Sequence, residues 1–460
     1  MTESNHFDVL IIGAGQAGVP LAHDLAKAGK HVALAEEKDL GGSCVNFGCT
    51  PTKAVIASAR VAHLARRGKE FGLEIPTVEL DFPAVLERAK RILIESRVSL
   101  QQGFEKTENP KLLHGSARFD GREMNAFRVA VGDQLIVAEQ VVLDTGTRST
   151  IPPIEGLDKV EFICAENWLD TAKLPEHLVI IGGGYIGLEM SQFYRRMGSR
   201  VTVIEGANQI AGHEDQDVSS ALQSLLAAEG IEFHLNTTVK RVESIQGSLK
   251  LALEKDKESF TLSASHLFVA TGRTPNTEDL GLETIGVRIS DRGIVEANER
   301  LGTNVEGVWV AGDIRGGPMF THTSWDDYRI LLSQLAGDRS RTTSRVVPYA
   351  VFTDPELGRV GMTESEARNN HKQIKVARYE MKGNGKAREL GETQGFIKVI
   401  IDAKTNRILG AAVLASEGAE LVHLYVDVMN AEAPYTVIRD AIHIHPTLAE
   451  AIQSAVKSFE

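Results

Sequence analysis

The sequence holds the same glycine-rich pattern twice, each time between an apolar strand and a helix. The first copy, FDVLIIGAGQAG, runs from Phe7 to Gly18, and the second, LVIIGGGYIG, runs from Leu178 to Gly187. With the helix and strand that follow, each copy gives a strand–turn–helix–strand unit, which is typical of dinucleotide-binding domains. A chain with two such units is expected to fold as an α/β protein around two mostly parallel sheets.

The glycines of the first pattern have separate physical roles. Gly13 permits a tight turn, Gly15 lets the backbone approach a pyrophosphate, and Gly18 lets the helix pack on the strand. The helix N-terminus then offers unpaired N–H groups to the phosphates. The corresponding glycines of the second copy are Gly182, Gly184 and Gly187. A strand–helix–strand unit without a ligand is the alternative, and the strand-and-helix context of both copies disfavours it.

An acidic residue ends the strand that follows each glycine pattern. Glu36 lies 23 residues after Gly13, and Glu205 lies 23 residues after Gly182. A single carboxylate at a strand end is usually only solvated, but two at the same offset predict acceptors for ribose hydroxyls. At Glu205 the carboxylate would repel the 2′-phosphate of NADP, and the next residues supply no cation, although Arg200 precedes the strand. We therefore predict NADH rather than NADPH.

The length suggests about three domains, at roughly 150 residues per domain. We expect residues 1–150 to form the first part of one nucleotide-binding domain and residues 151–275 to form the second nucleotide-binding domain. Residues 276–346 would return to the first domain, and residues 347–460, where the pattern changes to strands with intervening helices, would form a separate α+β domain.

The chain has three cysteines, too few for a disulfide framework or a four-cysteine zinc site. Cys44 and Cys49 are five positions apart, and on a regular helix five residues rise about 7.5 Å and turn by about 140°. A disulfide requires an irregular backbone here, which nearby glycines make possible. Thr50 and Pro51 are expected to be the N-cap and first residue of a helix whose positive end favours a thiolate. The pair therefore suggests a redox dithiol; two unrelated core residues are the alternative.

At these residues the chain resembles the class I pyridine nucleotide-disulfide oxidoreductases, which include dihydrolipoamide dehydrogenase, glutathione reductase and mercuric reductase. The family pattern is Gly-Gly-Thr-Cys-x4-Cys-x-Pro-x-Lys, and this sequence differs by Ser43 in place of threonine. The resemblance covers essentially the whole chain. It implies two Rossmann-like domains, for FAD and NAD(H), and a C-terminal α+β dimerisation domain.

The resemblance also implies roles for individual residues. FAD would be bound by Gly13, Gly15, Gly18, Glu36, Ala117 and Asp313, and the nicotinamide cofactor by Gly182, Gly184, Gly187 and Glu205, with Val239, Gly272 and Arg273 nearby. Lys53 would lie beside flavin N5 with Glu189 as its salt-bridge partner, and Tyr185 matches a tyrosine that covers the nicotinamide pocket in some members. Cys49 would be the flavin-side thiolate and Cys44 the thiol that exchanges with substrate.

The C-terminal segment reads IHIHPTLAE, from Ile442 to Glu450. In the family the histidine before the proline, here His445, is the acid–base for the exchanging thiol, and Glu450 would orient it. A capping box of Thr447 and Glu450 is a second interpretation of the glutamate. The family histidine reaches the other subunit's site, which implies a homodimer with shared active sites. His443 is assigned no chemistry.

The substrate is the least determined part of the prediction. The NADH signature and the C-terminal motif most resemble dihydrolipoamide dehydrogenase, which implies a small-molecule or lipoyl disulfide, whereas the segment from Phe320 to Arg329 resembles bacterial relatives linked to reactive chlorine stress. True mercury reduction is disfavoured because no cysteine follows Cys164. The alternatives are a flavin-dependent reductase of quinones, metal ions or oxidants, and a nucleotide-binding scaffold without turnover.

Composition narrows the partners. The net charge of −12 disfavours nucleic acid and anionic membrane surfaces. No apolar run is long enough to span a membrane, and the first residues do not resemble a signal peptide. We expect a cytoplasmic enzyme without a resident metal.

Overall fold

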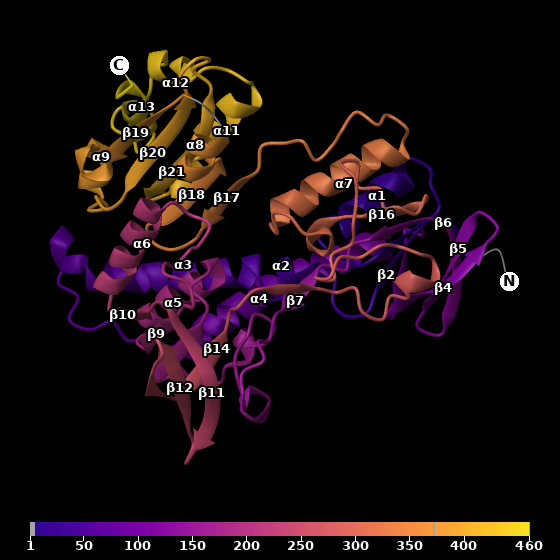
Figure 1. Cartoon of the computed structure of the whole chain (residues 1–460), viewed down its shortest axis with the longest axis horizontal. Coiled ribbons are helices and arrows are strands. Elements are labelled where there is room, and N and C mark those ends of the chain that lie inside the picture. The colour runs from indigo at the N-terminus through magenta and orange to yellow at the C-terminus, as the bar shows by residue number, and fades with distance from the viewer. Residues whose placement is uncertain (1–4, 371–372, 460) are drawn as a thin grey trace.

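The computed structural model describes residues 5–370 and 373–459, which form three units (Figure 1). The first unit lies at the N-terminal end, the second contains the repeat of the glycine pattern, and the third contains the C-terminal end. The long helices α3 (Cys49–Arg66) and α4 (Phe82–Glu105) lie between the units. No helix in the described part of the chain is long and apolar enough to cross a membrane.

The first unit is built on a seven-stranded sheet. Its parallel part contains β3 (Lys111–His114), β2 (Val32–Glu36), β1 (His6–Ile12), β6 (Gln134–Leu143) and β16 (Val308–Val310), and β5 (Ala126–Val131) and β4 (Ala117–Glu123) extend it in antiparallel fashion. Side chains alternate along β1, so that Val9 and Ile11 pack beneath α1 (Gly18–Lys27) and α7 (Thr321–Leu335), while Leu10 and Ile12 face the opposite core. The pairing of β16 with β6 brings a distant segment back into this sheet.

The second unit repeats the design on a smaller scale. A parallel sheet contains β10 (Ile231–His234), β9 (Arg200–Ile204), β8 (His177–Ile181) and β14 (His266–Val269). One face packs against α5 (Tyr185–Met197) and α6 (Gln216–Ala228), and the other packs against a three-stranded sheet of β11 (Thr237–Ile245), β12 (Ser248–Lys255) and β13 (Glu258–Ala264). The chain enters and leaves this unit through one two-stranded ribbon, in which β7 (Thr147–Ser149) pairs with β15 (Arg273–Pro275).

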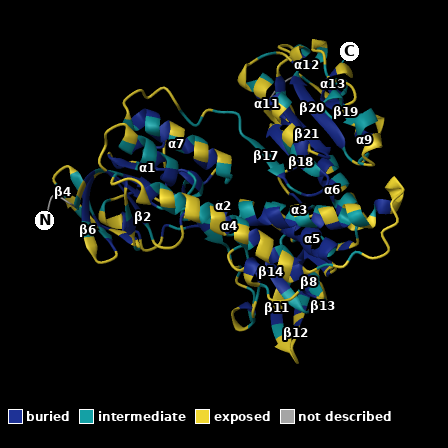
Figure 2. Ribbon diagram, turned by 180° about the vertical axis from the view of Figure 1, so that it is seen from behind, coloured by how far each residue is buried: buried dark blue, intermediate teal, exposed yellow. Residues whose placement is uncertain are grey.

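The third unit is an antiparallel five-stranded sheet in the order β17 (Pro348–Val351), β18 (Glu356–Gly361), β21 (Ile408–Ala415), β20 (Phe396–Asp402) and β19 (Ile374–Glu380). One face packs on α11 (His423–Asn430), α12 (Thr436–Asp440) and α13 (Glu450–Lys457). The other face contributes residues such as Leu357 and Phe396 to a core shared with α3, α4 and the second unit. The central strands are buried on both faces (Figure 2).

The predicted fold class is confirmed, with small differences at the ends of elements. The expected start of the helix after the cysteine pair is wrong by two residues, because α3 begins at Cys49 with Gly48 as its N-cap. Pro51 therefore occupies the third position of the helix, still within the first turn, where no backbone N–H is needed. Cys49 is itself the first helical residue.

Candidate functional site

A cavity of about 2880 Å³ connects the first glycine pattern, the cysteine pair and the second glycine pattern. The predicted site residues that line it are Gly13, Gly15, Glu36, Cys44, Cys49, Lys53, Ala117, Gly184, Tyr185, Glu189, Gly272, Arg273 and Asp313. Such a volume exceeds the roughly 300–1,000 Å³ of a drug-sized site, so the cavity has room for more than one extended ligand.

The turn of the first glycine pattern has no space for side chains. Gly13 has a φ of +105°, and a Cβ on it would lie 2.2 Å from the carbonyl oxygen of Asp144. A Cβ on Gly18 would lie 2.2 Å from the Gly13 carbonyl oxygen. Beside the turn, Oε2 of Glu36 accepts a hydrogen bond from the backbone N–H of Ala14 at 2.8 Å. The bare backbone and the carboxylate at its edge suit the pyrophosphate and ribose of FAD.

The second pattern reproduces this geometry. Gly182 has a φ of +111°, and a Cβ on Gly187 would lie 2.1 Å from the Gly182 carbonyl oxygen. Oε2 of Glu205 accepts from the backbone N–H of Gly183 at 2.7 Å, as Glu36 does in the first unit. Arg200, the cation before this strand, pairs with Glu232 on the neighbouring strand at 3.1 Å. The two units therefore share the position of the carboxylate relative to the glycine turn, as well as the glycine pattern itself.

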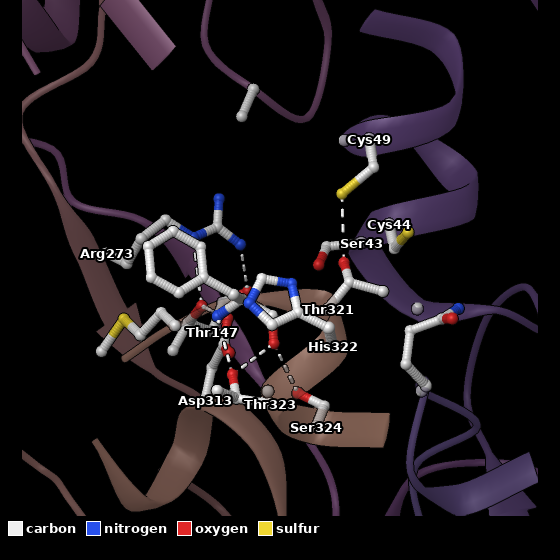
Figure 3. Close-up of a pocket in the computed structure, with 18 of the residues that line it drawn as sticks. Ser43, Cys44, Cys49, Thr147, Arg273, Asp313, Thr321, His322, Thr323 and Ser324 are labelled. Carbon is white, nitrogen blue, oxygen red and sulfur yellow. Dashed lines mark hydrogen bonds between the residues drawn. The ribbon is translucent and has the colours of Figure 1, made fainter. Parts of the chain in front are cut away.

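The cysteine pair lies on an irregular backbone. Gly41 and Gly42 both have positive φ and begin the five-residue helix α2 (Gly42–Asn46), which contains Cys44 and ends before Gly48. Both cysteines are unbonded thiols. The sulfur of Cys49 points to the hydroxyl of Thr321 at the start of α7, 3.1 Å away (Figure 3).

The surroundings of Cys49 favour its thiolate. Its pKa is lowered to about 6, first by the neighbouring Cys44 thiol and further by the Thr321 hydroxyl and the positive charge of Lys53. The same neighbours act oppositely on Cys44, whose pKa is raised chiefly by its interaction with Cys49 and by burial. The Thr321 hydroxyl lies within hydrogen-bond distance of the Cys49 sulfur, at 3.1 Å. These surroundings favour the thiolate at Cys49 and the protonated thiol at Cys44.

Lys53 and Glu189 form an ion pair across the α3–α5 contact. Nζ of Lys53 lies 2.8 Å from Oε2 of Glu189, and the other oxygen, Oε1, accepts from the backbone N–H of Phe352 at 2.9 Å. The lysine also lies 4.5 Å from the centre of the Phe352 ring. The buried carboxylate therefore holds the ammonium group at the cavity wall, near the cysteines.

Asp313 lies on the first-unit side of the cavity (Figure 3). It accepts a hydrogen bond from Thr147 at 3.2 Å, and Arg273 donates to the Thr147 hydroxyl at 3.0 Å and to its carbonyl oxygen at 2.6 Å. Burial raises the pKa of Asp313. Arg273, which the resemblance associates with the nicotinamide side, thus extends toward Asp313 and away from the second glycine pattern.

Several predicted residues lie outside the cavity lining. Gly182 lies in the second tight turn, Gly18 begins α1, and Gly187 lies in the first turn of α5. Glu205 accepts from the Gly183 backbone, and Val239 is part of β11. His445 and Glu450 belong to the third unit, whose terminal helices lie far from α2 (Figure 1).

The C-terminal histidine forms the predicted pair with Glu450. Nδ1 of His445 lies 3.0 Å from Oε1 of Glu450, and Oε2 accepts from the backbone N–H of Thr447 at 3.0 Å. The pairing with His445 is present, but the capping box is not complete. Helix α13 begins at Glu450 with Ala449 as its N-cap, and the Thr447 hydroxyl donates to the Ile444 carbonyl oxygen at 2.8 Å. The hydrogen bond from Thr447, followed by that from His445, lowers the pKa of Glu450. The His445 side chain is 77% exposed and Ile442 is fully exposed, so both side chains of this segment are accessible from outside the chain.

Sequence reasoning missed residues whose partners are distant in the chain. Thr321 contacts a cysteine 272 positions away, Phe352 reaches the site from the third unit, and Asp144 reaches Gly18 from the end of β6 in the first unit. Asp144 is fully buried, accepts from the Gly18 backbone N–H at 2.7 Å, and has a pKa raised by burial. Within the described residues, no group of three or more His, Cys, Asp or Glu side chains could hold a metal ion.

The lowered pKa of Cys49 predicts a titration near pH 6 in the reduced enzyme. Thiolate absorbance in the ultraviolet should fall as the pH drops through about 6, and Thr321→Val should move this transition to higher pH because the thiolate loses a hydrogen-bond donor. Cys49→Ser gives the baseline, and Thr342→Val, on the same cavity wall, is the matched control. The assignment fails if the dithiol enzyme has no transition between about pH 5 and pH 8.

Two family models together cover most of the chain. The model described as pyridine nucleotide-disulphide oxidoreductase matches residues 7–327, and the model of the dimerisation domain of the same family matches residues 347–456. The matched dimerisation domain supports a homodimer.

Individual relatives agree with these matches. The probable pyridine nucleotide-disulfide oxidoreductase RclA of Escherichia coli is 33% identical over 453 residues, covering 97% of this chain and 98% of that protein. The dihydrolipoyl dehydrogenase of Cupriavidus necator is 32% identical over 463 residues, covering 98% of each. A solved structure of RclA, described as an HOCl-induced flavoprotein disulfide reductase, superimposes with a TM-score of 0.89 at 32% identity and covers 98% of this chain and all of that one.

The glycine turns fit FAD and NAD(H), the cofactors of these relatives, and the dithiol lies between them. The chain therefore belongs to the pyridine nucleotide-disulphide oxidoreductase family and is an FAD-dependent oxidoreductase.

Proposed function

We propose that this enzyme passes electrons from NADH through FAD to the Cys44–Cys49 pair and on to a small-molecule or lipoyl disulfide, in the manner of dihydrolipoamide dehydrogenase. The observation that supports this best is that both thiols and Lys53 line one cavity, where the Cys49 sulfur lies 3.1 Å from the Thr321 hydroxyl. The neighbouring Cys44 thiol, the Thr321 hydroxyl and the charge of Lys53 lower the pKa of Cys49. When bound at the first glycine turn, FAD would supply the two-electron chemistry that links NADH to the cysteine pair. We also propose a cytoplasmic location, where a dithiol of this kind is kept in exchange with reduced nucleotide.

The residues of the chain supply the thiol chemistry. Cys44, once deprotonated, attacks one sulfur of the substrate disulfide, forming a mixed disulfide and releasing the first substrate thiolate. The Cys49 thiolate then attacks the Cys44 sulfur, forming the internal disulfide and releasing the second thiolate. Because the pKa of Cys44 is raised, a base is needed to remove its proton.

We assign that base to His445 of the partner subunit. In its own chain His445 is exposed, is oriented by Glu450 and does not line the cavity that contains Cys44. Its imidazole takes the Cys44 proton and returns it to the leaving thiolate. Each site of the homodimer is then complete only when both subunits contribute.

The deciding experiment is an NADH-oxidation screen with the FAD-loaded enzyme. Lipoamide, glutathione disulfide, other disulfides, quinones, Hg(II) and Cu(II) are offered as acceptors. Turnover with a disulfide, abolished by Cys44→Ser, supports the proposal, and failure with every disulfide overturns it. A scaffold without turnover is excluded if NADH bleaches the bound flavin.

Copper ions are a second candidate acceptor. One solved structure that covers 99% of this chain is described as a Cu(II) complex of RclA, and another as the Cu(II) complex of a cysteine-to-serine variant. In this chain the thiols of Cys44 and Cys49 are the soft ligands available at the cavity. Cu(II)-dependent NADH oxidation that exceeds turnover with all disulfides would favour this candidate.

We predict that kcat/KM is higher for NADH than for NADPH by more than about tenfold, because a like-charge contact costs more than about 1.4 kcal/mol. The Glu205 carboxylate lies beside the second glycine turn, where we propose that it accepts from the ribose, and Arg200 is paired with Glu232. Steady-state rates with both nucleotides measure the preference, and Glu205→Gln should narrow it. A preference for NADPH would contradict the assignment.

A further inference from the structure

A buried carboxylate, Glu214, joins two tyrosines that line the cavity and have no part in the thiol chemistry. Tyr185 begins α5, Glu214 precedes α6, and Tyr349 lies in β17 of the third unit. The hydroxyl of Tyr185 donates to Oε1 of Glu214 at 3.0 Å, and the hydroxyl of Tyr349 donates to the same oxygen at 2.7 Å. The Glu214 side chain is 0% exposed, so both bonds are made away from water.

The second oxygen of Glu214 has its own partner. Oε2 lies 2.8 Å from Nε of Arg359, at an angle that makes an ion pair without an aligned hydrogen bond. Arg359 is itself buried and donates from Nη1 to the Ala411 carbonyl oxygen at 2.6 Å. The negative charge of Glu214 is therefore balanced by buried Arg359 of the third unit, whether or not the tyrosine hydroxyls donate to the carboxylate.

The tyrosine rings form one end of an aromatic stack. The Tyr185 ring stacks on Tyr349 with centroids 5.6 Å apart, and Tyr349 stacks on Phe320 at 5.2 Å. All three residues line the cavity. Tyr185 lies within the second glycine pattern, directly after Gly184, and Glu189, one turn further along α5, pairs with Lys53. A nicotinamide ring that passes from the glycine turn toward Lys53 must therefore displace the Tyr185 side chain.

We propose that Glu214 and Tyr349 are positioning residues that form a latch for Tyr185 and set how readily NADH reaches the flavin side of the cavity. The proposal rests on the proposed function for its nucleotide. When Tyr185 moves away, Oε1 of Glu214 keeps the Tyr349 hydroxyl and Oε2 keeps Arg359, so no buried charged atom is left without a partner. Opening breaks the hydrogen bond from Tyr185 and leaves that from Tyr349 in place. Without the Tyr349 hydroxyl, opening would leave Oε1 of Glu214 with no hydroxyl donor.

This asymmetry predicts opposite effects of two matched substitutions in the FAD-loaded enzyme. Tyr185→Phe removes the bond that holds the closed state, so the apparent Kd for the nucleotide should fall by up to about tenfold. Tyr349→Phe makes opening more costly, so the apparent Kd should rise by about tenfold. The double variant should match Tyr185→Phe, because no hydroxyl then distinguishes the two states.

Binding of NAD+ by titration calorimetry and flavin reduction by NADH in stopped flow give two independent readouts. Tyr194→Phe, on the same helix but outside the cavity lining, should leave both unchanged. The latch is overturned if both single variants shift the Kd in the same direction, or if Tyr349→Phe has no effect. Opposite shifts in NAD+ binding without any flavin reduction would support the latch and refute the proposed function.

Discussion

Replacing Cys44 by serine is expected to lower kcat with disulfide substrates by roughly 10⁴–10⁶-fold, the scale seen when an enzyme loses its covalent nucleophile. A serine hydroxyl cannot form the mixed disulfide, and Cys49 alone cannot complete the exchange. NADH should still bleach the flavin at the parent rate, because the proposal assigns Cys44 to the substrate side of the pair. NADH oxidation with the disulfide found in the screen, and single-turnover flavin bleaching, measure the two steps separately.

The third cysteine provides the matched control. Cys164 does not line the cavity, and burial raises its pKa, so Cys164→Ser should retain full turnover. If Cys44→Ser kept its activity with disulfides, electrons would leave the flavin without the dithiol, and the alternative of direct reduction of quinones, metal ions or oxidants would replace the proposal.

The second large effect is expected at His445. His445→Gln should lower disulfide turnover by about 10²–10⁴-fold, the usual contribution of a general acid–base. Mixing this chain with the Cys44→Ser chain should then restore about a quarter of the parent activity, because half of the random dimers are mixed and each has one intact site. Steady-state rates before and after subunit exchange measure the recovery.

His443→Gln tests whether the loss is specific to His445. His443 belongs to the same exposed segment and has no assigned chemistry, so this variant should stay close to the parent. After mixing, the activity could stay at the average of the two inactive homodimers. That result would show that each chain completes its own site, and the shared-site proposal would be abandoned.

The fold followed from short-range features of the sequence. The two glycine patterns fix a strand, a tight turn and a helix locally, since a Cβ on Gly13 or Gly182 would collide with the backbone of a neighbouring strand. The central strands are mostly apolar, and their successive side chains enter cores on opposite faces, which fixes the two sheets between layers of other elements. The fold class and the cofactors were therefore within reach of the sequence, together with the family resemblance.

The details that tune the site depended on long-range contacts. No feature of the sequence near Thr321 indicates that its hydroxyl contacts Cys49. No feature near Glu214 indicates that it binds Tyr185, Tyr349 and a buried arginine, which come from three segments of the chain. These contacts arise only when separate units pack together. The start of α3 two residues earlier than expected has a local cause instead, because the backbone N–H of Gly48 donates to the carbonyl oxygen of Ser43 in α2 at 2.7 Å.

The ribbon of β7 and β15 has a consequence for how the molecule holds together. The second unit enters and leaves at adjacent points, as a cassette inserted into the first unit, and the backbone N–H of Thr150 donates to the Gly272 carbonyl oxygen across the junction. By chain path the cassette is separable. By packing it is not, because its apolar face shares one continuous core with α3, α4 and the C-terminal sheet. Removing the second unit would expose that core, so we expect the units that share it to unfold cooperatively.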